Sequence, residues 1–136
     1  MIDKEIIKIA SNTENHGMIS DHTHFSKLQN SICGDVMKIY LIIDNDKIVD
    51  FKYECESCIY CQASVSLLSK NAKNKSIEKV KKFTEQAINI FEKNLQSFDK
   101  ELKEFNKIIK KNNISRKECL LLPINTTLNA LNKKSL

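Results

Sequence analysis

The sequence predicts an α+β fold, a small antiparallel sheet of about three strands with helices packed on one face. Two adjacent segments, 36–43 and 47–54, are rich in β-branched and aromatic residues, and the Asp44-Asn45-Asp46 stretch between them is typical of a hairpin turn. From residue 57 onward the apolar residues recur at helical spacing instead. Because the strands come first and the helices follow, the sheet is expected to be antiparallel.

Periodicity and capping residues indicate the elements on either side of the hairpin. Apolar residues on one face of 2–11 predict a short N-terminal helix, and a weak alternation at 23–32 predicts a third strand. A helix is expected to begin at residue 57 or 58 and to end at about residue 71. Ser76 then has the character of an N-cap, so a further helix is expected to follow it.

The C-terminal half is predicted to be helical. From Ile88 to Ile109 apolar residues recur every three or four positions, which indicates one amphipathic helix or two helices broken near Ser97. Its apolar stripe most simply faces the core, and a surface for a partner helix is the alternative. Residues 115–132 predict a last helix whose regular part begins close to Pro123 or is kinked there, because proline has no amide hydrogen to donate.

Length and composition exclude several classes of protein. A chain of 136 residues suits one domain, 1–136, with a core of its own. It contains no apolar run of about 18 residues and begins with no signal-peptide pattern, so we expect a cytoplasmic protein without a membrane partner. The net charge is +5, but Arg116 is the single arginine and aromatic residues are few, so no nucleic-acid partner is expected.

The five cysteines are the main candidates for chemistry. They are Cys33, Cys55, Cys58, Cys61 and Cys119. In a chain without an export signal, an odd number of cysteines indicates metal binding, reactivity or burial more than disulfides. The 55-58-61 spacing does not continue as a ferredoxin motif, and a zinc ribbon would need a second close pair. His22 and His24 would share a strand face, but exposed strand histidines are the simpler interpretation.

The cysteines differ in what surrounds them. Cys33-Gly34-Asp35 precedes a predicted strand, and in an extended segment residues two apart point to the same side. A thiolate and a carboxylate can therefore face one metal ion, with Gly34 allowing the backbone to bend or a partner to approach closely. Cys58 falls at the expected start of a helix, where free backbone amides stabilise a thiolate.

Three motifs in order resemble the iron–sulfur cluster assembly scaffolds of the IscU, NifU N-terminal and SufU type. They are Cys33-Gly34-Asp35 before a hairpin, Ser57-Cys58 before a helix of small residues, and Arg116-Lys117-Glu118-Cys119 near the end. The resemblance extends from the first helix to Leu131.

Several details make SufU the closer match. The stretch between the second and third motifs is long, as in SufU proteins, and Glu118 stands where IscU proteins have a histidine. Arg116 stands where SufU-like proteins also have an arginine. Cys55 and Cys61 are additions to the family pattern, and a glycine is usual at Ser57.

The resemblance implies a set of site residues. Cys33, Asp35, Cys58 and Cys119 would bind the metal, with Cys33 also accepting a persulfide. Arg116 would hold a neighbouring thiolate or carboxylate through charge-assisted hydrogen bonds. One helical turn separates Cys58 from Cys61, so Cys61 is a candidate additional ligand. The role of Cys55 stays open.

The resemblance also implies a function. The first hypothesis is a non-enzymatic scaffold that receives sulfur from a cysteine desulfurase, binds iron or a labile [2Fe–2S] cluster, and passes it to apo iron–sulfur proteins or cluster carriers. The alternative is a zinc-dependent sulfur acceptor, a sulfurtransferase-type partner of the desulfurase. A structural zinc protein is the third. An oxygen ligand suits iron less well than sulfur does, so a cluster held partly by Asp35 would be labile, as a scaffold requires.

Overall fold

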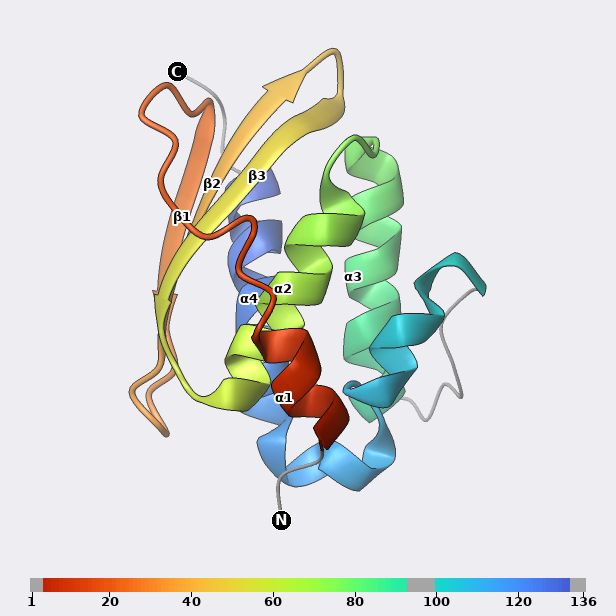
Figure 1. The fold of residues 1–136 in the computed structure, drawn as a ribbon. Coiled ribbons are helices and arrows are strands. Elements are labelled where there is room, and N and C mark those ends of the chain that lie inside the picture. The colour runs from red at the N-terminus through yellow and green to blue at the C-terminus, as the bar shows by residue number, and fades with distance from the viewer. Residues whose placement is uncertain (1–3, 93–99, 133–136) are drawn as a thin grey trace.

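The structure is a computed structural model that describes residues 4–92 and 100–132 (Figure 1). Helices and strands follow one another in the predicted order, with two short 3₁₀ helices, η1 and η2, before the last α-helix. The elements are α1 (Lys4–Ala10), β1 (His24–Gln29), β2 (Val36–Asp44), β3 (Lys47–Glu56), α2 (Ile59–Ala72), α3 (Ile77–Glu92), η1 (Lys100–Lys107), η2 (Lys111–Arg116) and α4 (Lys117–Asn132).

The three strands form one antiparallel sheet in the order β1-β2-β3, which confirms the predicted fold class. The hairpin turns at Asn45 and Asp46, whose φ angles of 50° and 60° are both left-handed. Asparagine and aspartate tolerate this conformation better than other side chains, and a turn with two such residues matches the twist of the strands. The local sequence therefore sets the turn, and an irregularity between Ile42 and Ile43 then shifts the register of β2 against β3.

The core lies between the sheet and the helices. Alternate residues of β2, namely Met37, Ile39 and Leu41, are fully buried, and α2 and α4 pack against this face. Helices α1 and α3 pack on the far side of α2 and α4 (Figure 1). The sheet therefore has helices on one face only, as predicted.

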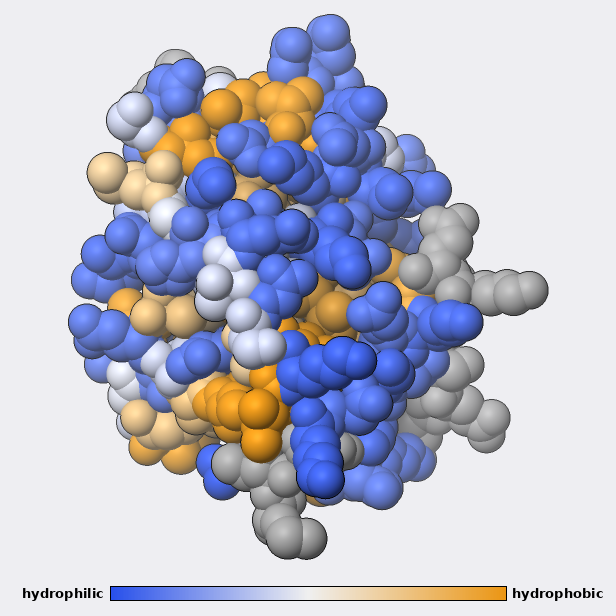
Figure 2. Space-filling model, in the orientation of Figure 1, coloured by the Kyte–Doolittle hydropathy of each residue, from blue (hydrophilic) through white to orange (hydrophobic). Residues whose placement is uncertain are grey.

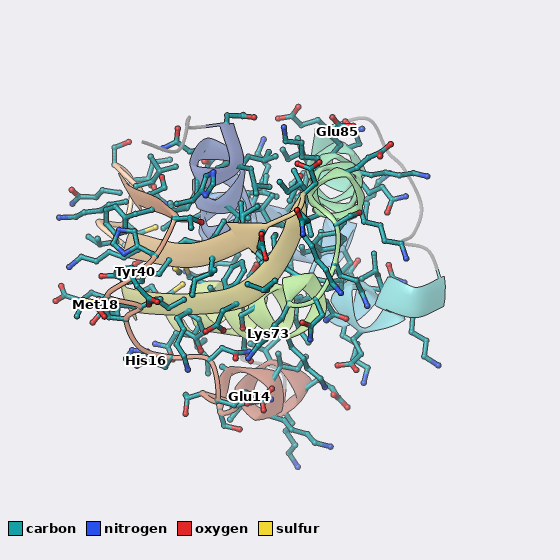
Figure 3. The ribbon with its side chains drawn as sticks, turned by 90° about the horizontal axis from the view of Figure 1, so that it is seen from above. Glu14, His16, Met18, Tyr40, Lys73 and Glu85 are labelled. Carbon is teal, nitrogen blue, oxygen red and sulfur yellow. The ribbon has the colours of Figure 1, made fainter. Side chains whose placement is uncertain are left out.

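The opposite face of the sheet carries aromatic and polar side chains. The Tyr40 hydroxyl donates a 2.6 Å hydrogen bond to Glu54, and the His22 and Phe25 rings pack around it. This hydrogen bond, then burial, raises the pKa of Tyr40 to about 12. Figure 3 shows Tyr40 on the same side of the molecule as His16 and Met18, away from α3.

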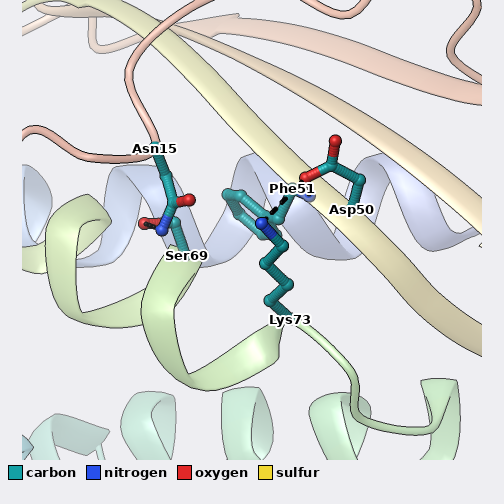
Figure 4. Close-up of polar contacts among 5 residues, drawn as sticks. All are labelled: Asn15, Asp50, Phe51, Ser69 and Lys73. Atoms are coloured by element: carbon teal, nitrogen blue, oxygen red, sulfur yellow. Dashed lines mark hydrogen bonds and ion pairs between the residues drawn. The ribbon is translucent and has the colours of Figure 1, made fainter.

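The connection from α1 to β1 is fastened to β3 and α2. Asn15 is buried, and its side-chain amide donates to the Ser69 hydroxyl at 3.2 Å (Figure 4). Its backbone carbonyl accepts from Tyr53, and the Gly17 amide donates to the Tyr53 carbonyl at 2.8 Å. Nearby, Lys73 pairs with Asp50. The hydrogen bonds of Asn15 and Gly17 hold a segment that has no regular structure of its own.

The predicted helix through Ile109 is wrong in part. Helix α3 is described as far as Glu92, and 100–107 is a 3₁₀ helix with non-helical angles at Leu102, so no single α-helix continues to Ile109. The break predicted near Ser97 lies outside the described residues. The core-facing interpretation of the apolar stripe is confirmed over the described part, because Phe105 and Ile109 are both fully buried. Burial fixes these side chains even where the backbone leaves the α-helical path.

Of the two expectations for Pro123, a regular helix that begins close to it is wrong, and a kink at this residue stays a prediction. The helix begins at Lys117, so the proline lies inside it. Proline removes the amide that would bond the Cys119 carbonyl, but the neighbouring residues are buried and hold the helical turn in the core. They are Leu120, Leu121, Leu122 and Ile124.

Ser76 caps α3 as predicted, and its removal should cost measurable stability. Its hydroxyl accepts a 3.1 Å hydrogen bond from the Lys79 amide. We expect Ser76→Ala to lower the free energy of unfolding by about 1 kcal/mol. Urea denaturation measures this, with the exposed Ser20→Ala as the control that should stay within about 0.5 kcal/mol of the parent. Equal stability of the two variants would contradict the assignment of the cap.

The surface is mostly hydrophilic on the face that Figure 2 shows, with apolar patches scattered across it. No helix among the described residues is both long and apolar enough to cross a membrane. A few large hydrophobic side chains are exposed. They are Ile7, Met18, Ile32, Val49 and Ile114.

Candidate metal centre

Three segments that are far apart in sequence meet at one end of the sheet, the lower end in Figure 1. They are the β1–β2 loop at 30–35, the junction of β3 with α2 at 57–58, and the first turn of α4. Each of them carries one of the three sequence motifs. The fold therefore brings the three motifs together.

Cys33, Asp35 and Cys119 form a compact group of metal-binding atoms. Their two sulfur atoms and one carboxylate oxygen all lie within 4.8 Å of one another. The Cys33 and Cys119 sulfurs are 3.4 Å apart, although 86 positions separate these residues. Asp35 and Cys119 are buried at 7% and 3% exposure, whereas Cys33 is exposed. The group is thus fixed on its inner side and open at Cys33.

Asn30 organises the loop that carries two of these groups, and the sequence analysis did not identify it. Its side-chain oxygen accepts from the Ile32 amide at 2.9 Å, and its side-chain nitrogen donates to the Cys33 sulfur at 3.2 Å. Its backbone carbonyl accepts from Gly34, and its amide donates to the carbonyl of Asp35. An asparagine three residues before a cysteine, at the end of a strand, is the signal that could have identified it.

The expected extended conformation of the Cys33–Asp35 stretch is wrong. This stretch is a turn, and Gly34 has a φ of +74°, the left-handed region that glycine adopts without strain. No atom lies within 4 Å of where a Cβ at Gly34 would be, so the glycine serves the bend and not a close approach. The side chains of Cys33 and Asp35 converge because the chain turns between them.

Cys58 lies beside the compact group and not within it. It occupies the N-cap position of α2, and its amide donates to the Asp35 carboxylate at 3.4 Å. A carboxylate at a helix N-terminus is stabilised by the free amides and the helix dipole. Burial raises the pKa of the Cys119 thiol, and the neighbouring Cys33 and Cys58 sulfurs raise it further. Cys58 is therefore close to both Asp35 and Cys119.

The two additional cysteines lie on the inner side of the same region. Cys61 is fully buried, and this burial raises the pKa of its thiol. Burial likewise raises the pKa of Cys55. The Ser57 hydroxyl lies near both thiols and offsets part of each rise. Neither cysteine belongs to the compact group, although both lie near Asp35 and Cys58.

Arg116 is near the site in sequence but packs elsewhere. Its guanidinium lies over the Tyr60 ring, 5.1 Å from the ring centre. Within 4–92 and 100–132 it makes no hydrogen bond to a thiol or carboxylate, so the positioning role stays a prediction. The His22 Nδ1 donates a 2.7 Å hydrogen bond to the Ile19 carbonyl, and neither His22 nor His24 belongs to the compact group.

The donor set fits a soft or borderline metal ion. Thiolates and carboxylates are both zinc ligands, and two sulfurs on a tetrahedral zinc ion would be about 3.8 Å apart, from zinc–sulfur bonds of about 2.3 Å. The observed 3.4 Å lies within a few tenths of an ångström of that separation. Two thiolates and an oxygen leave at least one position for a further ligand.

We expect Gly34→Ala to lower both stability and metal affinity. The left-handed φ of +74° would cost an alanine roughly 1 to 2 kcal/mol, and relief of that strain would move Cys33 away from Asp35. Urea denaturation and titration with Co²⁺ measure the two effects. Gly17→Ala, at a φ of +141° and away from the compact group, is the matched control that should lose stability alone. Unchanged Co²⁺ affinity in Gly34→Ala would contradict the role given to the bend.

Comparisons with known proteins place this fold and site in a family. The family model described as "NifU-like N terminal domain" matches residues 1–110, a stretch that includes Cys33, Asp35 and Cys58. The solved structure of FiSufU from Fervidobacterium islandicum, named as an iron–sulfur cluster assembly scaffold protein for the SUF system, superposes with a TM-score of 0.87. Its identity to this chain is 27%, and 96% of each chain is covered.

Curated relatives agree with that match. The scaffold protein IscU 1 of Archaeoglobus fulgidus is 31% identical over 88 residues, and IscU of Thermotoga maritima is 28% identical over 135. The first alignment covers 65% of this chain and 58% of the relative, and the second covers 99% of this chain and 95% of the relative. The chain thus spans little more than half of the archaeal protein. The zinc-dependent sulfurtransferase SufU of Bacillus subtilis is 33% identical over 67 residues, 49% of this chain and 45% of that protein. This chain belongs to the family of NifU-like N-terminal domains.

Proposed function

We propose that the protein is an iron–sulfur cluster assembly scaffold that receives sulfur from a cysteine desulfurase. The observation that carries this proposal is the compact group of Cys33, Asp35 and Cys119, which combines one exposed thiol with two buried ligands. An exposed thiol can accept sulfur from another protein, while buried ligands keep a cluster bound. The names of the Archaeoglobus and Thermotoga relatives support the same function.

In this proposal Cys58 supplies the fourth ligand. Its amide donates a hydrogen bond to the Asp35 carboxylate, and its sulfur lies close enough to Cys119 to raise the pKa of that thiol. Rotation of the Cys58 side chain would therefore bring its sulfur into the group. The bound cargo is then a [2Fe–2S] cluster with three thiolate ligands and one oxygen. Cargo leaves for apo iron–sulfur proteins or cluster carriers, because the oxygen is the weakest ligand.

Anaerobic metal analysis and a desulfurase assay test the proposal together. The chain is purified without oxygen, its iron, zinc and acid-labile sulfide are measured, and the turnover of a cysteine desulfurase on L-cysteine is followed with and without it. Iron, visible absorbance and stimulated turnover support the scaffold. Loss of metal in Cys61→Ser, with metal retained in Cys58→Ser, would reverse the assignment of the fourth ligand. Absence of both stimulation and metal would overturn the function.

A zinc-dependent sulfur acceptor is the second candidate. The sequence relationship to the zinc-dependent SufU of Bacillus subtilis favours it, and so does the 3.4 Å separation of the Cys33 and Cys119 sulfurs, which is close to that of two thiolates on a tetrahedral zinc ion. In this case a resident zinc ion is held by Asp35, Cys58, Cys119 and Cys33, and the exposed Cys33 is the ligand free to react. Zinc without iron, together with stimulated desulfurase turnover, distinguishes it from the scaffold. Zinc without stimulation indicates a structural zinc protein instead.

A further inference from the structure

We propose that Cys119 is an internal reductant that releases sulfide from a persulfide held on Cys33. The inference rests on the proposed function, which places the incoming sulfur on Cys33. Sulfur arrives from a desulfurase in the zero oxidation state, whereas a cluster contains sulfide. Two electrons must therefore be added to the sulfur atom before it can enter a cluster. A second thiol next to the persulfide can supply them together with the Cys33 sulfur, by forming a disulfide with it.

The distance between the two sulfurs is suited to this reaction. Cys119 and Cys33 are 3.4 Å apart, within the separation of about 3 to 3.5 Å from which bound groups react readily. Cys119 is 3% exposed and approaches from the protein side, while Cys33 is exposed. Sulfur added to Cys33 therefore has room on the solvent side, and the inner sulfur stays next to Cys119.

The loop that carries Cys33 can make the remaining movement. A disulfide bond is about 2.05 Å long, so the sulfurs must approach by more than one ångström. Cys119 is fixed within α4, but Cys33 precedes Gly34, whose backbone can rotate without a Cβ clash. The Asn30 amide, 3.2 Å from the Cys33 sulfur, restrains where that sulfur lies.

The reaction balances without any other reductant. The Cys119 thiol releases its proton to water at the exposed Cys33 side of the group. Its sulfur forms a bond with the inner sulfur of the Cys33 persulfide, and the bond between the two persulfide sulfurs breaks. The outer sulfur leaves with the electron pair as hydrosulfide. It has gained two electrons, and each cysteine sulfur has lost one in forming the disulfide.

A low-molecular-weight thiol or a dithiol protein would then reduce the disulfide and restore both ligands. Cys119 is the donor, and not Cys58, because the Cys58 sulfur lies outside the compact group. Cys55 and Cys61 lie outside it as well. The geometry therefore assigns this step to one of the four other thiols of the chain.

A single-turnover experiment tests the inference without the desulfurase. The reduced full chain, free of metal and of external thiol, is loaded with glutathione persulfide, and the excess is removed. Sulfide release is followed over time, and peptide mapping by mass spectrometry locates the persulfide and any disulfide. We expect about one sulfide per chain and a disulfide between Cys33 and Cys119. Cys119→Ser should keep the persulfide and release sulfide at least roughly tenfold more slowly, since the oriented thiol is lost.

Controls separate this inference from the proposed function. Cys55→Ser removes a thiol outside the group and should behave as the parent. Circular dichroism shows whether Cys119→Ser is folded. If that variant does not fold, the disulfide mapped in the unmutated chain tests the inference. A disulfide to Cys58, or a stable persulfide on Cys33 of the parent, would overturn the role of Cys119 alone. Failure of Cys33 to take up the persulfide would overturn the proposed function as well.

Discussion

Cys33→Ser should abolish stimulation of a cysteine desulfurase and weaken metal binding by more than roughly 100-fold. Cys33 is the exposed member of the compact group, so it is the thiol that a partner protein can reach. A serine hydroxyl is similar in size, but it neither accepts a persulfide nor replaces a thiolate on a soft metal ion. Desulfurase turnover on L-cysteine and competition for Zn²⁺ with a chelator of known affinity measure the two losses.

The substitution should leave the fold intact, for a physical reason that can be checked. Cys33 is exposed in a turn, and within the described residues its side chain forms hydrogen bonds with Asn30 and Cys119, both in the site. Circular dichroism and urea denaturation of Cys33→Ser should therefore match the parent within about 0.5 kcal/mol. Cys55→Ser removes a half-buried thiol outside the group and is the matched control. Full stimulation by Cys33→Ser would exclude both the scaffold and the zinc-dependent sulfur acceptor.

The parts of the fold that were predicted correctly depend on local signals. The hairpin follows from β-branched segments and from Asn45 and Asp46, which adopt left-handed angles at little cost. The start of α3 follows from a capping serine at position 76. The 3₁₀ helix at 100–107 was not predictable, because apolar spacing of three and four fits both helix types. The expectation that the regular part of α4 begins close to Pro123 failed, because buried neighbours can hold a helix that proline alone would weaken.

In the candidate site, too, some features were predicted from the sequence and others depend on the folded chain. That Cys33, Asp35 and Cys119 come together was expected from three motifs, but the way they do so was not. Alternation along a strand does not apply in a turn, and the positive φ of Gly34 has no signal beyond the glycine itself. Asn30 was missed because its importance lies in several hydrogen bonds to its own loop, which only the folded backbone defines.

Asp35→Cys should make a bound cluster more persistent and slow its transfer roughly tenfold, because thiolate is a better iron ligand than carboxylate. Asp35 is buried in the compact group, so a cysteine there would place its sulfur beside those of Cys33 and Cys119. The chain is loaded anaerobically with iron and sulfide, and loss of visible absorbance to a chelator or to an apo-ferredoxin gives the rate. The charge at the α2 N-terminus is kept, since a thiolate can also accept from the Cys58 amide.

Two further variants determine whether the oxygen ligand is the cause. Asp21→Cys adds a thiol at an exposed position outside the compact group and should leave the transfer rate unchanged. Asp35→Asn keeps the shape of the side chain but removes its charge, so it should lower the amount of cluster bound instead of prolonging its lifetime. Equal transfer rates for Asp35→Cys and the parent would mean that the carboxylate does not bind iron. Because zinc accepts sulfur and oxygen ligands alike, Asp35→Cys should change the release of zinc far less than that of a cluster, which separates the scaffold from the zinc-dependent acceptor.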